Sequence, residues 1–406
     1  MFSREKQTFF IKTFGCQQNV ADAERIVSYY EARGFLRSES ESEADTVVVN
    51  TCMIRDRAEE KVYGYMRNLR KRKSAKEQRI VMTGCIVGAS MREPSGKMRK
   101  KLEKRIPDVE LLPLEEVGFE YAPKRTHKKH AWVVISNGCN NFCSFCIVPF
   151  SRGKEVSRPF ANIIAEVGDL SEKGYTSVTL LGQNVNSYGA DLIAKSKSRN
   201  GNVKSGKEGA TNLYTLPDGT AIKPVMVKHL GRFRIPTLFP YLLEKVARVK
   251  GLTNISFISA NPWDFSDDLI SVIAKNENID RLIHLPVQSG SNNILKKMNR
   301  WYTREEYMKL IEKIRRNVPN VKFATDIIVG FPGETEEDFL ATVDLAERVK
   351  FVKVFAACYS PRPGTSATKE MEDNIPREEK RRRFRVLDDL INHKGARALE
   401  TKWMRQ

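Results

Sequence analysis

Short apolar runs alternate with amphipathic segments over the first part of the chain. Residues 8–14, 45–50 and 79–83 are apolar and of strand length, whereas residues 21–33 and 57–73 have the spacing and charge of surface helices. Strands and helices that alternate in this way are typical of an open parallel sheet with helices packed on it. The sequence therefore predicts an N-terminal α/β domain over residues 1–125.

A second strand–helix series follows a basic, proline-containing linker at residues 113–130. Six apolar runs predict its strands, at residues 131–136, 177–182, 254–260, 281–288, 322–330 and 352–360. Amphipathic segments between them predict helices at residues 159–173, 238–250, 266–275, 291–298, 303–317 and 334–349. Six parallel strands joined by helical crossovers predict an open, partial (β/α)6 barrel, to which we assign residues 126–385.

One segment, residues 189–236, interrupts this second series. Its first part is rich in Gly, Ser and Lys, which predicts a polar surface stretch, and residues 214–227 predict a hairpin around Pro217, Asp218 and Gly219. We interpret the segment as a surface insertion, with a flap that contacts substrate as the alternative. After the barrel a helix is expected over residues 378–399, so that residues 386–406 form its end and a linker.

Three cysteines each follow one of the N-terminal strands within about two residues. They are Cys16, Cys52 and Cys85. The carboxyl ends of parallel strands share one edge of a sheet, where ligands bind. Each cysteine alone is explained as a core residue, but the repeated placement favours a site with three thiolates.

A second set of three cysteines, Cys139, Cys143 and Cys146, has the spacing C-x3-C-x2-C just after the first barrel strand. A cubic iron–sulfur cluster has four irons, so three thiolates leave one iron open to a substrate or cofactor. The alternatives are a zinc site with a remote fourth ligand and three buried apolar cysteines. The seventh cysteine, Cys358, lies in an apolar strand and is interpreted as structural.

The chain is strongly basic, with a formal net charge of +19 and a pI near 9.6. Positive side chains gather at residues 70–76, 97–105, 124–130 and 380–385, which predicts an extended basic surface and a nucleic-acid partner. Seven cysteines in 406 residues do not make a disulfide scaffold. We see no signal peptide and no membrane-spanning run, so we expect a cytoplasmic protein without a membrane partner.

Several motifs together resemble the methylthiotransferase family of radical S-adenosylmethionine (SAM) enzymes. The N-terminal motifs are KTFGCQQN, VVNTC, AEEKVYG and MTGC, and the cysteine loop reads CNNFCSFCIVPFSRGKEVSRP. LLGQNVNSYG, LPVQSGSN, TDIIVGFPGET and YSPRPGT complete the match, which leaves out only residues 189–236. GQNVNSYG, GCQQN and YSPRPGT resemble the branch that modifies N6-dimethylallyladenosine in tRNA, the MiaB type. Such enzymes usually finish with a basic TRAM module, which we do not find before Gln406.

This resemblance implies a methylthio transfer to carbon 2 of N6-dimethylallyladenosine at tRNA position 37, in the anticodon loop. It implies two 4Fe–4S clusters, one on Cys139, Cys143 and Cys146 and the other on Cys16, Cys52 and Cys85. It also implies SAM as methyl donor and radical source, and an external one-electron reductant; we expect a monomer. The alternatives are the branches that act on threonylcarbamoyladenosine or on a ribosomal-protein aspartate, and a non-catalytic iron–sulfur protein that binds RNA.

Residues around the cysteine loop and at the ends of barrel strands are the candidates for SAM contacts. The resemblance implies this role for Phe145, Gly182, Gln183, Asn184, Gln288, Ser289, Val329 and Gly330. A tight turn explains each of the strand-end positions equally well. Arg152 and Arg158 follow the cysteine loop and are candidates for binding the SAM carboxylate or an RNA phosphate, with a surface salt bridge as the alternative.

Overall fold

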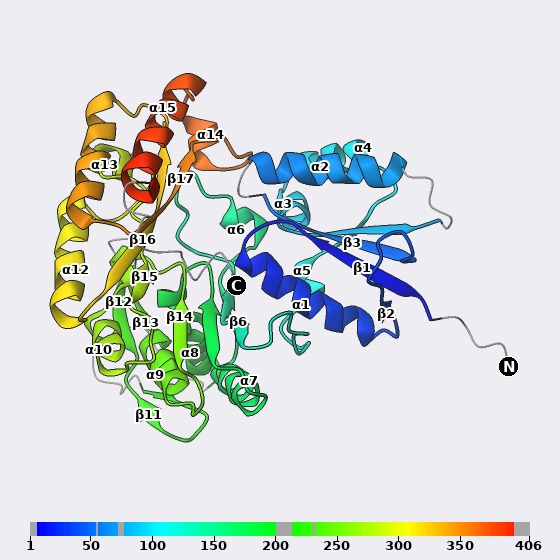
Figure 1. Cartoon of the computed structure of the whole chain (residues 1–406), viewed down its shortest axis with the longest axis horizontal. Coiled ribbons are helices and arrows are strands. Elements are labelled where there is room, and N and C mark those ends of the chain that lie inside the picture. Colours follow the sequence, from blue (N-terminus) through cyan, green and yellow to red (C-terminus); the bar gives the residue numbers. More distant parts are fainter. Residues whose placement is uncertain (1–5, 54–55, 72–76, 200–212, 230–232, 394–406) are drawn as a thin grey trace.

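Two α/β units make up the described part of the chain and lie side by side (Figure 1). The computed structural model describes residues 6–53, 56–71, 77–199, 213–229 and 233–393. The first unit is built on one parallel sheet, and the second on two parallel three-stranded sheets. The predicted fold class, a parallel α/β domain followed by a second strand–helix series, is confirmed.

The first unit is a five-stranded parallel sheet with the order β2-β1-β3-β4-β5. Its central strand is buried along its whole length, because helices cover both faces of the sheet. The strands are β1 (Thr8–Thr13), β2 (Leu36–Arg37), β3 (Thr46–Thr51), β4 (Arg79–Gly84) and β5 (Glu110–Leu112).

The helices of this unit pack on both faces of the sheet, with α1 on one side and α2 and α4 on the other (Figure 1). Val48 of β3 packs with Ile26 of α1, whereas Val47 and Val49 pack with Met66 of α2. This split follows from the alternation of side chains along a strand. The helices are α1 (Gln17–Glu31), α2 (Asp56–Lys71), α3 (Cys85–Arg92), α4 (Lys97–Arg105) and α5 (Leu114–Val117).

The second unit contains six parallel strands in sequence order, paired as β6-β9-β14 and β15-β16-β17. All six are shorter than predicted, β14, β15 and β17 by three residues or more. The backbone leaves β14 before Ser259, whose φ is +66°, and Pro286 has no N–H with which to continue β15. The strands are β6 (His130–Val134), β9 (Ser177–Leu181), β14 (Asn254–Phe257), β15 (Leu282–His284), β16 (Lys322–Val329) and β17 (Lys353–Cys358).

The predicted crossover helices are present, and several begin at a side-chain cap. Thr303 and Thr335 form capping boxes with Glu306 and Asp338, which satisfy free N–H groups of the first helical turn. The helices are α7 (Phe160–Glu172), α9 (Phe239–Ala247), α10 (Asp267–Lys275), α11 (Asn292–Lys297), α12 (Arg304–Asn317) and α13 (Glu336–Val349). Shorter elements are β7 (Ser136–Asn137), α6 (Val148–Ser151), β8 (Val156–Ser157), η1 (Val185–Ser187), η2 (Pro262–Asp264) and α14 (Ser366–Glu370).

The insertion differs from its prediction at both ends. It begins with helix α8 (Ala190–Arg199) rather than a polar loop, because Ile193 is buried in the barrel core. The predicted hairpin is present but shorter, as β10 (Tyr214–Thr215) and β11 (Ala221–Ile222). Residues 225–227 belong instead to a second ribbon, formed by β12 (Val225–His229) and β13 (Phe233–Thr237). Residues 200–212 lie outside the described part.

The C-terminal helix α15 (Arg377–Asp388) continues into a π-helical turn, η3 (Asp389–His393). Residues 394–406, where the predicted helix end and linker fall, lie outside the described residues. Within the described part, we find no helix with the length and apolar character needed to span a bilayer.

Candidate active site

The first cysteine trio lies at the carboxyl ends of three adjacent strands. Cys16 precedes α1 directly, Cys52 follows β3, and Cys85 is the first residue of α3. The register pairs Thr13 with Asn50 and Thr51 with Gly84, so the three strands end at the same level. The structure thus brings these three cysteines to one edge of the sheet.

Two features of the chain bring Cys16 and Cys52 close together. Gly15 has a φ of +131°, and a Cβ atom placed on it would lie only 2.7 Å from the Cβ of Cys52. Side-chain amides then join the neighbouring strand ends, since Asn19 donates to the Thr51 carbonyl at 2.9 Å and Asn50 donates to the Asn19 carbonyl at 2.8 Å. These buried bonds fix the relative positions of the loops that carry the cysteines.

The second trio occupies the loop between β7 and α6, which the barrel holds from two sides. The Cys139 N–H donates to the Gly153 carbonyl at 3.1 Å. Ser144 forms two hydrogen bonds with the end of α11. Its backbone N–H donates to the Met298 carbonyl, and its hydroxyl donates to the Lys297 carbonyl. The loop is therefore anchored at its first cysteine and between its second and third cysteines.

Burial makes at least one thiol in each trio reluctant to ionise, as the raised pKa values of Cys16, Cys139 and Cys146 indicate. Burial raises the pKa of Cys16, and it raises the pKa of Cys139 well above the ordinary value. For Cys146, burial and then the neighbouring Cys143 raise the pKa to about 12. A metal ligand must be a thiolate, so metal binding at such thiols releases protons and compensates the buried charge.

The two trios face each other across the junction between the units. Helix α3, which begins at Cys85, packs against α6, which follows Cys146. The thiol of Cys85 is near enough to contribute to the raised pKa values of both Cys16 and Cys146. Ile147, next to Cys146, packs in the core of the first unit.

The arrangement of the thiols bears on the zinc alternative. Among the described residues, no three His, Cys, Asp or Glu side chains converge on one point as ligands of a single ion would. Zinc requires that convergence. In a cubic cluster each thiolate binds a different iron, so a cluster does not require the three thiols to meet at one point.

Arg152 and Arg158 are both buried, which differs from their expected exposure to a ligand. Arg152 forms an ion pair with Asp22 at 2.8 Å and donates to the Asn137 side chain at 2.9 Å. Arg158 pairs with Glu166 at 2.6 Å and donates to the Val134 carbonyl. Both arginines therefore form ion pairs, as the alternative expected, but buried rather than at the surface, and Arg158 Nε has no hydrogen-bond partner within the described residues.

Polar atoms without a partner lie at the end of β9, where SAM contacts were predicted. Gln183 Oε1, Asn184 Oδ1 and Ser136 Oγ are buried and have no hydrogen-bond partner within the described residues. A Cβ on Gly182 would lie 2.6 Å from Ser136 Oγ, so only glycine leaves this group in place. Unsatisfied buried acceptors are costly, and a bound ligand with ammonium or hydroxyl donors would satisfy them.

The other predicted SAM contacts have structural roles of their own. Gln288 has a φ of +70°, and its backbone bridges to β16. Ser289 is fully buried beside Thr342, while Val329 lies in the barrel core. The Gly330 N–H donates to Glu334 at 2.6 Å. Phe145 packs against the barrel core between the second and third cysteines of the loop.

Sequence reasoning missed Arg300, which donates from Nη1 to the sulfur of Cys143 at 3.4 Å. It follows α11, far from the cysteine loop in the sequence, and its side chain is buried. Its neighbours Met298, Trp301 and Tyr302 are apolar or aromatic, and this was the one local signal that the turn packs into the core.

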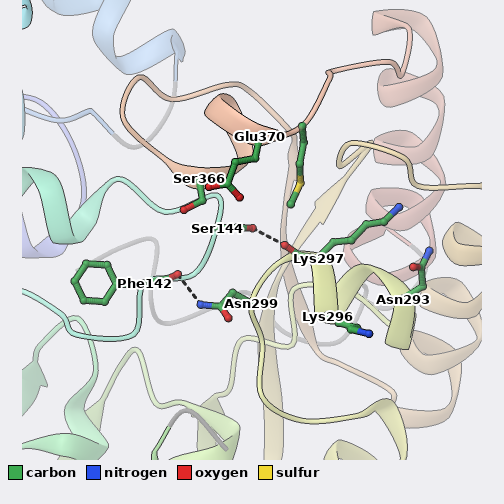
Figure 2. Close-up of a pocket in the computed structure, with 9 residues that line it drawn as sticks. Phe142, Ser144, Asn293, Lys296, Lys297, Asn299, Ser366 and Glu370 are labelled. Carbon is green, nitrogen blue, oxygen red and sulfur yellow. Dashed lines mark hydrogen bonds between the residues drawn. The ribbon is translucent and has the colours of Figure 1, made fainter.

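An open pocket of ≈ 540 Å³ adjoins the cysteine loop. Figure 2 shows Phe142 and Ser144 of the loop on one side and residues of α11 on the other. Phe142 has a φ of +46° and is 52 % exposed, and Asn299 holds its carbonyl at 2.9 Å. The pocket is lined by Phe142, Ser144, Asn293, Lys296, Lys297, Asn299, Ser366, Glu370 and Met371.

The predicted extended basic surface is interrupted by buried ion pairs. Residues 97–105 form the exposed helix α4. By contrast, Arg125 pairs with Glu24, and Lys380 and Arg383 are buried against carboxylates. Parts of the 124–130 and 380–385 clusters therefore stabilise the fold rather than face a partner, and residues 72–76 lie outside the described part.

Comparison with known proteins agrees with this geometry. Residues 133–346 match the radical SAM superfamily, and residues 8–109 match the uncharacterized protein family UPF0004. The radical SAM methyltransferase TsrM from Kitasatospora setae has a similar fold, with a TM-score of 0.53, 13 % identity, and coverage of 90 % of this chain and 75 % of that chain. The chain is a radical SAM protein, which implies a 4Fe–4S cluster and SAM.

Curated relatives define the family more closely. The tRNA-2-methylthio-N(6)-dimethylallyladenosine synthase of Thermotoga petrophila is 40 % identical over 95 % of this chain and 82 % of its own length. The enzymes of the same name from Thermosipho africanus and Carboxydothermus hydrogenoformans are 41 % and 38 % identical, over 94 % and 95 % of this chain and 82 % and 84 % of their own lengths. This chain belongs to the family of tRNA-2-methylthio-N(6)-dimethylallyladenosine synthases.

Proposed function

We propose that this chain places a methylthio group on carbon 2 of N6-dimethylallyladenosine at position 37 of tRNA. One observation carries the proposal: two sets of three cysteines face each other across the junction, with Cys85 close to Cys146. Each set leaves one corner of a cubic cluster free. A reaction that joins sulfur to a carbon atom needs one site that activates the carbon and one site that supplies the sulfur, and the two sites must lie next to each other.

In this proposal Cys139, Cys143 and Cys146 hold one 4Fe–4S cluster, and Cys16, Cys52 and Cys85 hold a second. When bound, the two clusters and SAM supply the one-electron and sulfur chemistry that an unactivated aromatic C–H bond requires. An external one-electron reductant completes the reaction.

The chain itself supplies position and exclusion of water. Cys52, Cys85, Cys139 and Cys143 are buried, and the ion pair of Arg152 with Asp22 holds the two units together beside them. At the end of β9, Gln183 Oε1 and Asn184 Oδ1 are free acceptors for the ammonium group of SAM. Asn184 is oriented for this by its own amide, which donates to Asp264 at 2.7 Å.

The pocket beside the cysteine loop is the proposed contact for a nucleotide next to the target base. The exposed ring of Phe142 offers a stacking surface, and Lys296 and Lys297 offer positive charge for a phosphate (Figure 2). Unpaired bases of RNA loops are commonly bound by stacking on aromatic side chains. Phe142 also adjoins Cys143, so a base stacked there lies next to the loop that carries the cluster.

The test is a product assay under anaerobic conditions. The reconstituted protein receives SAM, a one-electron reductant and dimethylallylated tRNA, and mass spectrometry measures the 2-methylthio nucleoside and 5′-deoxyadenosine. Both are expected, and the same tRNA without the dimethylallyl group serves as the matched control. A protein with two clusters that modifies only threonylcarbamoyladenosine tRNA or a ribosomal-protein aspartate, or modifies nothing, would overturn the proposal.

A further inference from the structure

The guanidinium group of Arg300 is buried, and its contacts come from several parts of the barrel. Nη1 donates to the sulfur of Cys143 at 3.4 Å, and Nη2 donates to the Pro286 carbonyl at 2.9 Å. Nε donates to the Tyr302 hydroxyl at 3.2 Å, and the group lies 4.4 Å from the ring centre of Trp263. The side chain is thus held in one orientation, with one N–H directed at a predicted cluster ligand.

Arg300 lacks the carboxylate partner that the other buried arginines have. Among the described residues, five buried arginines form ion pairs with an Asp or Glu, and Arg300 forms none. The five pairs are Arg25 and Arg152 with Asp22, Arg158 with Glu166, Arg362 with Glu59 and Arg383 with Glu334. A buried cation without a counter-charge is strongly unfavourable. The one negative group that its contacts offer is the sulfur of Cys143, as a thiolate bound to iron.

We propose that Arg300 is a positioning residue for the cluster on Cys139, Cys143 and Cys146, as the counter-charge that stabilises the reduced cluster. The cluster becomes more negative on accepting an electron, and a fixed cation hydrogen-bonded to a ligand sulfur favours that state. Hydrogen bonds to the sulfurs and net charge are among the factors that set the potential of such clusters. The inference rests on the proposed cluster at this trio and is independent of the tRNA substrate.

The proposal predicts opposite effects on stability with and without the cluster. Without iron, Arg300 is a buried cation with hydrogen-bond acceptors but no negative group beside it in the described part of the chain, so we expect a neutral side chain there to leave the protein about as stable or more stable. With iron, the same replacement removes the partner of the bound thiolate and destabilises the protein. An arginine that only fills space would instead stabilise both forms.

The test compares Arg300→Gln and Arg300→Lys with Arg304→Gln, a nearby arginine that pairs with Asp344 and makes no contact with the trio. All are made in the full chain carrying Cys16→Ala, Cys52→Ala and Cys85→Ala, so that only one cluster binds. A redox titration followed by electron paramagnetic resonance measures the ratio of reduced to oxidised cluster, and thermal unfolding is measured with and without iron.

We expect Arg300→Gln to lower that ratio about tenfold at a fixed ambient potential, a shift of about 59 mV to more negative values for one electron. Arg300→Lys keeps the charge and should restore most of the ratio, and Arg304→Gln should leave it unchanged. A ratio in Arg300→Gln equal to that of the parent, or equal destabilisation with and without iron, would overturn the proposal. If Arg300→Gln does not fold, the proposal is overturned as well, because the iron-free form is expected to tolerate it. Because no tRNA is used, failure of the product assay leaves this result intact.

Discussion

The carboxylate of Asp22 lies 2.8 Å from the guanidinium of Arg152, and both side chains are buried at the junction of the two units. Arg25 shares the same carboxylate at 2.6 Å. Burial alone would raise the pKa of Asp22, but Arg152 and Arg25 hold that pKa below its ordinary value. One charged aspartate therefore joins the helix that follows Cys16 to the segment that follows Cys146, and it fixes the separation of the two trios.

Replacing this carboxylate should be costly. Asp22→Asn leaves two buried arginines without their partner, so we expect a loss of about 3–5 kcal/mol in the free energy of unfolding. Urea unfolding measures it, with Asp344→Asn as the control, because that residue is half exposed and its ion pair is expected to contribute about 1 kcal/mol or less. Similar losses in the two variants would contradict a special role for the junction.

Gly15→Ala should remove the first cluster site. Gly34 also has a positive φ, so an alanine at either position costs about 1–2 kcal/mol in backbone strain. A Cβ on Gly34 meets nothing within 4 Å, whereas a Cβ on Gly15 meets Cys52 at 2.7 Å. We expect Gly15→Ala to bind about half the iron of the parent and Gly34→Ala to bind the full amount. Equal iron contents would show that the contact with Cys52 does not matter.

Glu155 should make stability depend on pH. Burial raises the pKa of Glu155 to about 8 from the ordinary 4.5, although both of its carboxylate oxygens accept hydrogen bonds from Ser187. The folded state therefore keeps a proton that the unfolded state releases, and stability falls as pH rises from about 4.5 to about 8. Glu155→Gln should remove this slope, so the variant gains a few kcal/mol over the parent at pH 8. Parallel pH profiles of unfolding for the two proteins would refute this.

The pocket residues should affect RNA binding without affecting the clusters. Phe142→Ala removes a stacking surface, and we expect a loss of about 1–3 kcal/mol in tRNA affinity. Lys296→Gln should reduce the salt dependence of binding by about one phosphate contact. Leu340→Ala and Lys309→Gln are exposed controls on α13 and α12. Fluorescence anisotropy at several salt concentrations measures both effects, and unchanged affinity in Phe142→Ala would place the RNA elsewhere.

Local patterns in the sequence were sufficient to predict most elements of the fold. Buried strands and capped helices are determined by residues close together in the chain, which is why β3 and α12 were predicted within two residues. The errors arose where contacts between residues far apart in the sequence determine the local structure. Ile193 turns a polar stretch into helix α8 because the barrel core receives it, and β14 and β15 end early at Ser259 and Pro286.

The positions of the cysteines at strand ends were predictable for the same reason, since spacing and strand ends are local features. The charged partners of these sites were not. Arg300 and Cys143 are 157 residues apart, and Asp22 and Arg152 are 130 apart. Local sequence does not say which distant side chain either arginine contacts, so only the assembled fold reveals these partners.

The iron content of three proteins tests the central claim most directly. The parent chain, a variant with Cys16, Cys52 and Cys85 changed to Ala, and a variant with Cys139, Cys143 and Cys146 changed to Ala are reconstituted anaerobically, with Cys358→Ala as the control. We predict about eight irons in the parent and in Cys358→Ala and about four in each triple variant. About four irons in the parent, or the same content in the parent and the first triple variant, would contradict the two facing cluster sites.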